Sequence, residues 1–469
     1  MIAREGDIGS PPASIVQHPL LSRSYKRWLV FVLLVVTTVH FADRAILSVL
    51  AQPIKEDLQL TDTDLGMLQG LGFAILYSVL GIPLGWLAER ISRKGLIAAC
   101  VAFWSFMTVA CGFATSFATL LLGRVGVGVG EAGLMPPASS LIADHFRADR
   151  RASVIAIVLL GSPLGLLLGQ SVGGWVAAEW NWRIAFFALG IPGLLCALLV
   201  WLGLREPPRG LAEGKVAADD PPSIMSVFIH LWSTPALRHL ILGWAVASFS
   251  MNAVAHFVLP FYLRGFGLSL AVVGAAFGAV ASTSNGLGML FSGFGFDWLR
   301  QRDQRWSLWG PAIGLILAVP LYVGAFASTD AWVSMAFIWF ANFVLISYLA
   351  STMAAAQNLV GPRMRALVTA VFFLVSGLIG AGLGPTVLGI ASDFFASRAF
   401  AAGDFIASCP GGRAPAGAAR ALDGACRAAS ADGLREALMA VQIVFLWAAA
   451  HYFLAARHLR AGGADSSRS

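Results

Sequence analysis

Charged residues are scarce in this chain of 469 residues: Asp, Glu, Lys and Arg together make up 12% of it. Ordinary soluble domains contain about 25%. Hydrophobic residues make up 58%, and the mean hydropathy is +0.75. This composition indicates an integral membrane protein, with room for about twelve spans of ~20 residues and short connections.

Signatures of several other function classes are missing from the sequence. No G-x-x-x-x-G-K-[ST] loop and no stretch for a soluble ATPase domain is present, which argues against an ATP-driven pump. There is no H-E-x-x-H motif and the histidines are scattered, so a membrane-embedded lipid-modifying enzyme is the weaker alternative. We expect a protein that is not an enzyme and holds neither a metal nor another cofactor.

The net charge of +7 does not indicate a nucleic-acid partner, because the basic residues lie in short clusters between apolar runs. These clusters follow every second expected span, as the positive-inside rule predicts for cytoplasmic loops. Both termini are therefore expected to be cytoplasmic. A long loop on the predicted outer side carries arginines against this pattern, which longer loops tolerate. The polar first 25 residues lack a signal-peptide core, so the first apolar run should be retained.

The expected spans form two sets of six around a polar, proline-containing stretch. This predicts an all-α membrane protein of two six-helix bundles in one folded unit, working as a monomer in the bilayer. The predicted regions are a cytoplasmic tail at 1–25, an N-terminal bundle at 26–204, a central linker at 205–236, a C-terminal bundle at 237–457 with a periplasmic loop at 394–435, and a cytoplasmic tail at 458–469.

Two short motifs relate the halves to each other. Gly85-Trp-Leu-Ala-Glu89 ends the second span, and Gly293-Phe-Gly-Phe-Asp297 ends the eighth. An acidic residue four positions after a glycine, at the same place in each half, is typical of a duplicated six-helix unit and favours a transporter over a channel. We predict that charged residues here form a conformational switch on the cytoplasmic side, namely Glu89, Arg93, Asp297, Arg147 and Arg151.

Charged residues also occur inside two of the spans. Arg124 and Glu131 stand seven residues apart in an apolar, glycine-rich run, where each uncompensated charge costs at least ~2.5 to 3.5 kcal/mol. Seven residues make nearly two helical turns, so both side chains share a face. Asp43 and Arg44 in the first span point about 100° apart and cannot both face one partner. Together the four predict a polar site within the bundle.

Each of these charges has two interpretations. Asp43 and Glu131 are candidate proton-coupling groups, because burial and nearby arginines act in opposite directions on a carboxylate's proton affinity. Arg44 and Arg124, with Glu131, are candidate substrate-binding residues, since a guanidinium suits phosphate or carboxylate oxygens. Alternatively, Asp43 and Arg44 belong to a static network between the first and fourth spans, and Arg124 pairs with Glu131 or a helix end. Buried ion pairs stabilise poorly, which favours the functional interpretation for the network.

Polar residues in the second half are fewer. Ser248, Asn252 and His256 recur at four-residue steps and share one stripe, so Asn252 and His256 are predicted to line the substrate site. His256 is either a proton site or a hydrogen-bonded packing residue. Cys409 and Cys426 bracket a Gly/Ala/Pro-rich segment of the long outer loop, and they either form a disulfide in an oxidising compartment or remain free.

Several of these motifs resemble those of a known family. Gly85 to Lys94 is similar to the loop motif of the major facilitator superfamily between its second and third helices, with Glu89 where aspartate is more common. Phe41-Ala-Asp43-Arg44 and the run from Arg124 to Phe146 resemble the Spinster proteins, which are sphingolipid and lysolipid transporters.

The resemblance implies a twelve-helix major facilitator fold, and the excess of arginine over lysine indicates a bacterial homologue, which we expect in the inner membrane. It further implies a lipid-like cargo, an amphipathic anion of the sphingosine-phosphate or lysophospholipid class. The buried carboxylates add the expectation of proton coupling, and the duplicated halves that of alternating access. Small organic anions or drugs are the alternative cargo, because neighbouring families carry them.

Overall fold

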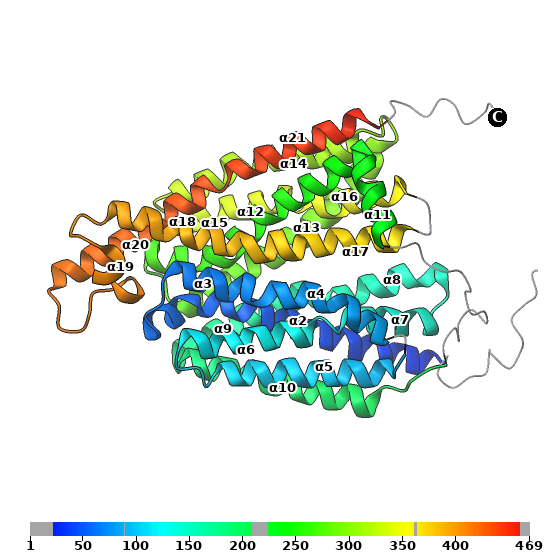
Figure 1. Ribbon diagram of the computed structural model, residues 1–469, viewed down its shortest axis with the longest axis horizontal. Helices are drawn as coiled ribbons and strands as arrows, with labels where there is room; N and C mark the ends of the chain where they lie inside the picture. Colours follow the sequence, from blue (N-terminus) through cyan, green and yellow to red (C-terminus); the bar gives the residue numbers. More distant parts are fainter. Residues whose placement is uncertain (1–21, 89, 209–223, 361–363, 460–469) are drawn as a thin grey trace, which may run out of the picture.

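The computed structural model describes residues 22–88, 90–208, 224–360 and 364–459, and its regular structure is helical. Twelve helical segments are long and apolar enough to cross a membrane. They form two bundles, the N half and the C half, which lie side by side along their length (Figure 1). The predicted fold class of an all-α, twelve-span protein is therefore confirmed.

Several spans of the N half are built from two helical segments. Its helices are α2 (Arg23–Asp57), α3 (Asp62–Gln69), α4 (Leu71–Ala88), α5 (Arg93–Cys111), α6 (Phe117–Glu131), α7 (Met135–His145), α8 (Ala148–Leu159), α9 (Gly161–Glu179) and α10 (Trp182–Gly203).

The C half follows a short helix in the expected linker, α11 (Ile224–Ser233). Its helices are α12 (Pro235–Phe266), α13 (Leu270–Arg300), α14 (Trp306–Ala327), α15 (Ala331–Leu345), α16 (Ser347–Asn358), α17 (Arg365–Val375), the π-helical segment η3 (Ser376–Leu383), α18 (Gly384–Ala399), α19 (Phe405–Ser408), the 3₁₀ turn η4 (Pro410–Gly412), α20 (Arg420–Ala440) and α21 (Ile443–Arg457).

The positions of the chain termini distinguish the two ends of the bundle. α2 begins and α21 ends at the same end, on the right of Figure 1, which we name the inner end. At the opposite, outer end, short polar loops start new helices with capping side chains. Ser116 caps α6, Asn181 caps α10 and Ser269 caps α13, each accepting a backbone N–H that the new helix leaves unpaired.

A break in the fourth span positions the charged motif. α6 ends at Glu131, and α7 begins at Met135 with prolines in its first turn. Proline lacks an N–H group and cannot continue the hydrogen-bond ladder of the preceding helix. Glu131 consequently lies at a helix discontinuity in mid-span, the kind of position at which transporters bind substrates and ions.

Glycines allow α9 to pack directly on α2. Gly165 and Gly169 face the backbone of Thr38 and Ala42, and a Cβ atom on either glycine would overlap the carbonyl oxygen opposite. Close backbone approach through small residues is a common way of joining helices in membranes. It places α2, which carries Asp43 and Arg44, firmly in the centre of the N half.

Buried apolar side chains form two main clusters in the membrane region. One runs through the C half and continues into the outer part of the N half, where it includes Ile46, Ile54 and Leu65. The other lies in the inner part of the N half, around Leu33 and Trp104. The continuous core therefore joins the halves toward the outer end.

Candidate functional site

Glu131 is the centre of the predicted charge cluster. Its side chain is buried, and one oxygen, Oε2, lies 3.1 Å from Nε2 of His40 and 3.2 Å from Nε of Arg44. Neither contact has the alignment of a directed hydrogen bond, so the Arg44 pair is held mainly by charge attraction. Both partners lie on α2. The first and fourth spans are thus joined through one shared carboxylate oxygen.

His40 was not among the site residues predicted from the sequence. It precedes Arg44 by four residues, and positions four apart share a helix face. With Arg44 already identified as a candidate, this four-residue spacing could have identified His40 from the sequence.

Asp43 faces a different neighbour from Arg44, as the 100° step between adjacent helical residues requires. Its Oδ2 accepts a 2.5 Å hydrogen bond from the hydroxyl of Thr108 on α5. Its other oxygen has no hydrogen-bond partner among the described residues. The carboxylate is buried and within electrostatic reach of Glu131, Arg124 and Arg44, so the four predicted residues do form one cluster.

An aromatic ring lies between the two arginines. The guanidinium carbon of Arg44 is 4.6 Å from the ring centres of both Phe73 and Tyr77, and that of Arg124 is 5.3 Å from Phe73. Cations are attracted to aromatic faces at such distances. Arg124 is buried, and its Nε and Nη1 have no hydrogen-bond partner in the described part of the chain.

Arg44 and Arg124 differ in access and pairing. The Arg44 side chain is 28% exposed although it pairs with Glu131, whereas Arg124 is 3% exposed. Within the described residues, Arg124 makes no ion pair with Glu131. Arg124 therefore retains donors that an anion can use.

Of the polar stripe on α12, Ser248 and Asn252 lie against Gly380 of η3, and His256 is the residue that reaches this cluster from the other half. His256 is within electrostatic reach of Arg124 and Arg44. Its Nδ1 lies 2.8 Å from the carbonyl oxygen of Asn252, whose amide donates to the carbonyl of Ser248 at 2.8 Å. Asn252 and His256 are therefore occupied in part by their own helix backbone. Nε2 of His256 takes no part in the contact with the Asn252 carbonyl.

Arg93 of the predicted switch holds together parts of the N half. Its guanidinium contacts the carboxylate of Asp144 and donates to Glu206 at 2.8 Å and to the carbonyl of Pro207 at 3.0 Å. Partial burial disfavours the charged form of Glu206, but hydrogen bonds from the Lys94 N–H and from Arg93 outweigh it and hold its pKa below the usual value. Arg93 thereby anchors the chain that leaves α10.

The other predicted switch residues have varied positions. Arg151 donates to the carbonyl oxygens of Phe146 and Ala143, at the end of α7, at 3.0 and 2.7 Å. Arg147 is exposed at the start of α8. Glu89 and the side chain of Asp297 lie outside the described residues.

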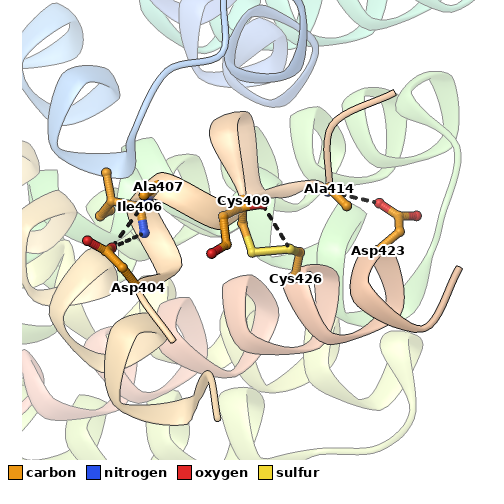
Figure 2. Close-up of a disulfide and its surroundings, with 8 residues drawn as sticks. Asp404, Ile406, Ala407, Cys409, Ala414, Asp423 and Cys426 are labelled. Carbon is orange, nitrogen blue, oxygen red and sulfur yellow. Dashed lines mark hydrogen bonds between the residues drawn. A yellow bond between two sulfur atoms is a disulfide. The ribbon is translucent and has the colours of Figure 1, made fainter. Parts of the chain in front are cut away.

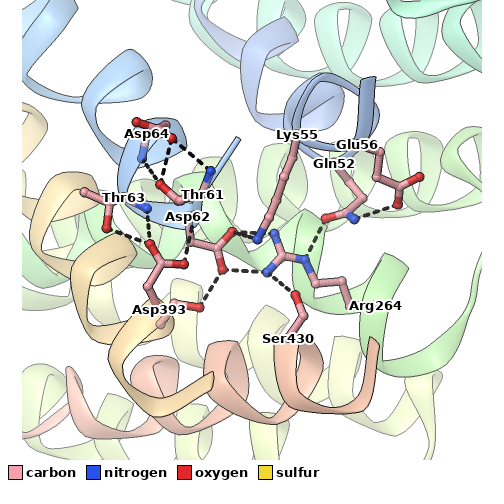
Figure 3. Close-up of polar contacts among 11 residues, drawn as sticks. Gln52, Lys55, Glu56, Thr61, Asp62, Thr63, Asp64, Arg264, Asp393 and Ser430 are labelled. Carbon is pink, nitrogen blue, oxygen red and sulfur yellow. Dashed lines mark hydrogen bonds and ion pairs between the residues drawn. The ribbon is translucent and has the colours of Figure 1, made fainter. Parts of the chain in front are cut away.

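Buried charges at the outer end form a network between the halves, which we name the outer network (Figure 3). Asp62 at the start of α3 accepts from Lys55 at 2.7 Å, and both amino groups of the Arg264 guanidinium lie 2.7 Å from its oxygens. Ser392 of α18 adds a 2.6 Å hydrogen bond to the same carboxylate. Arg264 and Ser392 belong to the C half, so Asp62 bonds directly across the interface.

Asp393 completes the outer network by capping a helix of the opposite half. Its carboxylate accepts the backbone N–H groups of Asp62 and Thr63 at 3.0 and 2.7 Å. A carboxylate at a helix N-terminus satisfies unpaired N–H groups and is favoured by the helix dipole. None of these residues was predicted as a site. Lys55 and Arg264 are basic residues near outer connections, where the positive-inside rule disfavours them. Their unusual position is the feature by which the sequence could have singled them out.

A small outer lobe, residues 400–430, projects beyond the membrane helices (Figure 1). Cys409 and Cys426 are joined in a disulfide with a Cα–Cα distance of 5.5 Å (Figure 2). The bond fixes η4 beside the start of α20, and Gly411 of η4 packs against the backbone of α2 at Lys55 and Glu56. Its positive φ of 69° is a conformation that glycine adopts without strain.

A pocket of about 360 Å³ lies under this lobe, away from the Glu131 cluster. Gln52, Glu56 and Arg264 line it together with Arg413 of the lobe. Arg413 donates to Glu56 at 3.0 Å, and Arg264 donates to Gln52 at 2.6 Å. These pocket groups are already paired with each other, which makes the Glu131 cluster the stronger candidate for a binding site.

The string Gly169-Gln-Ser-Val-Gly173 matches the G-x-S-x-G pattern of serine hydrolases. In those enzymes the serine lies on a sharp turn between a strand and a helix. Here the five residues lie inside α9, on the part of the helix that packs against α2 and α13. The match therefore gives no support to a hydrolase.

Comparisons with known proteins identify the family and the fold of this chain. Residues 33–385 match the Major Facilitator Superfamily. An MFS-type efflux pump of Mycolicibacterium smegmatis is 34% identical over 366 residues, which is 77% of this chain and 83% of that protein. Protein spinster homolog 1 of Homo sapiens is 29% identical over 402 residues, 80% of this chain and 74% of that protein.

Solved structures extend the similarity to three dimensions. The crystal structure of a bacterial homolog to the human lysosomal transporter Spinster, in an inward-facing and unoccupied conformation, has a TM-score of 0.85 and 32% identity, covering 93% of this chain and 98% of that one. Its inward-facing and occupied form has a TM-score of 0.83 and 31% identity, with the same coverage. The chain belongs to the Major Facilitator Superfamily of membrane transporters and is a homologue of the Spinster proteins.

Proposed function

We propose that this transporter works by proton-coupled alternating access and moves an amphipathic anion of the lysophospholipid or sphingosine-phosphate class. One observation carries the proposal. Glu131 is in contact with Arg44, while Arg124 beside it keeps guanidinium donors without a hydrogen-bond partner among the described residues. A buried arginine with unused donors is costly unless an anion or water occupies it for part of the cycle.

The surroundings of the arginines favour an amphipathic cargo over a small polar one. Phe73 lies within 5.3 Å of both guanidinium groups, so a headgroup bound there has an aromatic surface next to it. Planar guanidinium groups suit phosphate oxygens, and the apolar helices around them suit an acyl chain. The similarity to Spinster proteins supports the same class of cargo.

The outer network supports an inward-facing state for this conformation. Asp62 and Asp393 connect the halves at the outer end, and the apolar core is continuous there. In the proposed cycle these contacts break when the outer side opens. The predicted switch residues Glu89, Arg93, Asp297, Arg147 and Arg151 then close the inner side, in the bacterial inner membrane.

Proton coupling is assigned to the two buried carboxylates. Glu131 shares Arg44 with the cargo, so an anion that attracts Arg44 leaves Glu131 without its counter-charge. A buried carboxylate in that situation gains from a proton. Asp43 keeps one oxygen without a hydrogen-bond partner among the described residues, which leaves it able to take part.

Ligand binding by the purified protein tests the cargo class. A thermal-shift series with lysophosphatidylglycerol and sphingosine phosphate should show stabilisation of the wild type. Arg44→Ala and Arg124→Ala should each lose it, and Arg398→Ala, which removes an exposed arginine from α18, should retain it. Equal stabilisation of all four proteins would overturn the assignment of the arginines to the cargo site.

Export of drugs or small organic anions is the second candidate, favoured by the 34% identity to an MFS-type efflux pump. Counterflow in proteoliposomes separates the two. Labelled lysophosphatidylglycerol should exchange across the membrane unchanged, whereas an efflux pump should exchange a labelled drug and leave the lipid behind. A chemically altered label would instead indicate the enzyme alternative.

A further inference from the structure

His40 shares an oxygen of Glu131 with Arg44, although it carries no role in the transport cycle proposed above. Its Nε2 lies 3.1 Å from Oε2 of Glu131, and Nε of Arg44 lies 3.2 Å from the same atom. The imidazole is 3% exposed and stands edge-on to Trp104, with ring centres 5.8 Å apart. Its Nδ1 has no hydrogen-bond partner among the described residues.

Two basic groups at one carboxylate oxygen are interchangeable as counter-charges. Arg44 is always charged, so while it contacts Glu131 the pair is neutral and His40 has no need of a proton. If Arg44 turns to an anionic cargo, Glu131 remains buried and loses that partner. Histidine is the side chain that changes its charge near neutral pH, so the imidazole beside Glu131 can supply the missing positive charge.

We propose that His40 is the proton-carrying partner of Glu131, protonated when cargo draws Arg44 away and deprotonated when Arg44 returns. The inference rests on the proposed function and changes one part of it: the proton that compensates Glu131 when Arg44 leaves is carried by His40 beside it instead of by the carboxylate itself. For each anion that engages Arg44, one proton passes from the solvent to the ring nitrogen of His40 that lacks one, and the imidazolium stays 3.1 Å from Glu131. No other bond forms or breaks, and the site gains one negative and one positive charge.

The groups around His40 are consistent with this exchange. The charged and titratable side chains near the pair come from α2, α4, α6 and α12, and they are Asp43, Arg44, Tyr77, Arg124, Glu131 and His256. From α5, Trp104 and Thr108 face the site, and Thr108 is bonded to Asp43. α9 packs on α2 through Gly161 and Gly165, which have no side chain to titrate. Glu131 is thus the carboxylate in direct contact with the imidazole.

Exposure favours Arg44 as the movable partner. Its side chain is 28% exposed, whereas those of His40 and Glu131 are 3% and 0% exposed. An arginine at the edge of the site can swing toward a ligand at small cost, because its long side chain has several rotatable bonds. The imidazole between α2 and Trp104 stays in place, as a stationary proton carrier requires.

Proton uptake on binding tests the proposal directly. Lysophosphatidylglycerol is the probe, because its phosphodiester does not titrate near neutral pH and any proton change belongs to the protein. In weakly buffered solution with a pH indicator, wild type should take up about one proton for each molecule bound at a pH slightly above neutral. His40→Gln keeps an N–H donor for Glu131 but cannot titrate, and it should bind without uptake.

A control variant and a melting temperature show whether the loss of proton uptake is specific to His40. His145→Gln removes another buried histidine, on α7, and should leave the uptake unchanged. Undiminished uptake in His40→Gln would overturn the inference and assign the proton to Glu131 or Asp43. A His40→Gln protein that takes up no proton yet melts at the wild-type temperature excludes a merely structural role.

A second measurement needs no cargo and separates failure of the inference from failure of the proposed function. Nitrogen-15 NMR of histidine-labelled protein, with the His40 signal identified by its absence in His40→Gln, follows the imidazole during a pH titration. In Arg44→Ala the midpoint should rise by about one pH unit or more relative to wild type, since His40 is then the remaining direct counter-charge. An unchanged midpoint would overturn the inference even if lysophosphatidylglycerol binds.

Discussion

Asp393 of α18 accepts two hydrogen bonds from Thr63 of α3, one from its backbone N–H at 2.7 Å and one from its hydroxyl at 2.6 Å. The two residues belong to opposite halves, so a helix cap of the N half is supplied by the C half. Capping normally stabilises a single helix. Here it also stabilises the conformation in which the outer ends of the halves are together.

Removing this cap should open the outer side. Asp393→Ala loses a capping carboxylate worth about 1 to 2 kcal/mol, which corresponds to roughly a fivefold to thirtyfold shift in a two-state equilibrium. Spin labels at Ala118, exposed in the first turn of α6, and at Thr329, exposed in the loop before α15, report the distance between the outer ends of the two halves. The longer-distance population should grow in Asp393→Ala. Asp404→Ala, which removes a cap within the outer lobe, should leave it unchanged.

Asp62→Asn should have a larger effect, because it leaves Lys55 and Arg264 buried with a weakened counter-charge. Breaking a buried pair in this way costs about 3 to 5 kcal/mol. The same label pair should report a predominantly open outer end, and the protein should melt at a lower temperature. A distance distribution like that of wild type would contradict the gating role of the outer network.

Neutralising both site carboxylates should uncouple transport from protons. In Glu131→Gln with Asp43→Asn, an imposed pH gradient should no longer drive accumulation of labelled lysophosphatidylglycerol in proteoliposomes. Counterflow needs no driving force and should persist, which shows that the double variant is folded. Accumulation that still follows the pH gradient would disprove coupling through these carboxylates.

Glu206 should make stability depend on pH in the acid range. Hydrogen bonds hold its folded-state pKa below the usual glutamate value despite partial burial. The contribution of the Glu206 carboxylate to the free energy of unfolding is therefore complete above the unfolded-state pKa of about 4.3. It is lost as pH falls through the lower, folded-state pKa. Melting curves from pH 7 downward should show a smaller acid-induced loss in Glu206→Gln than in wild type. Glu436→Gln, at an exposed position of α20, is the matched control.

Reducing the disulfide should weaken the contact between the outer lobe and α2. Cys409 and Cys426 are 17 residues apart, and closing a loop of that size is worth about 3 kcal/mol in the chain-entropy model. Cys409→Ser with Cys426→Ser should melt at a lower temperature and increase the outward-open population reported by the labels. Arg413→Ala breaks only a partly exposed ion pair with Glu56 and should cost less than about 1 kcal/mol. Equal effects of the two variants would mean that the disulfide does not position the lobe.

The fold class follows from short-range features of the chain. Apolar runs between charged loops predict spans because unpaired backbone groups and charges are costly in hydrocarbon, wherever the helix packs. The 3.6-residue period likewise places Arg124 and Glu131 on one face. The same period would have placed His40 beside Arg44, since the two are one turn apart.

The pairing of those charges depends on contacts between helices. Sequence left Arg124 as a possible partner of Glu131, but Glu131 contacts His40 and Arg44, because α6 ends at Glu131 and its side chain there reaches α2. The hydrogen bond from Thr108 of α5 to Asp43 likewise could not be predicted from the sequence of either helix alone.

The sequence by itself determined a twelve-span membrane protein with charges inside its first and fourth spans, because hydrophobicity and helical period act within each segment. Only the tertiary structure decided which charges meet. Asp62, Arg264 and Asp393 lie on three helices far apart in the chain, and no local pattern relates them. They meet because the outer ends of the two halves pack together, and a buried charge is stable there only when an opposite charge from the other half reaches it.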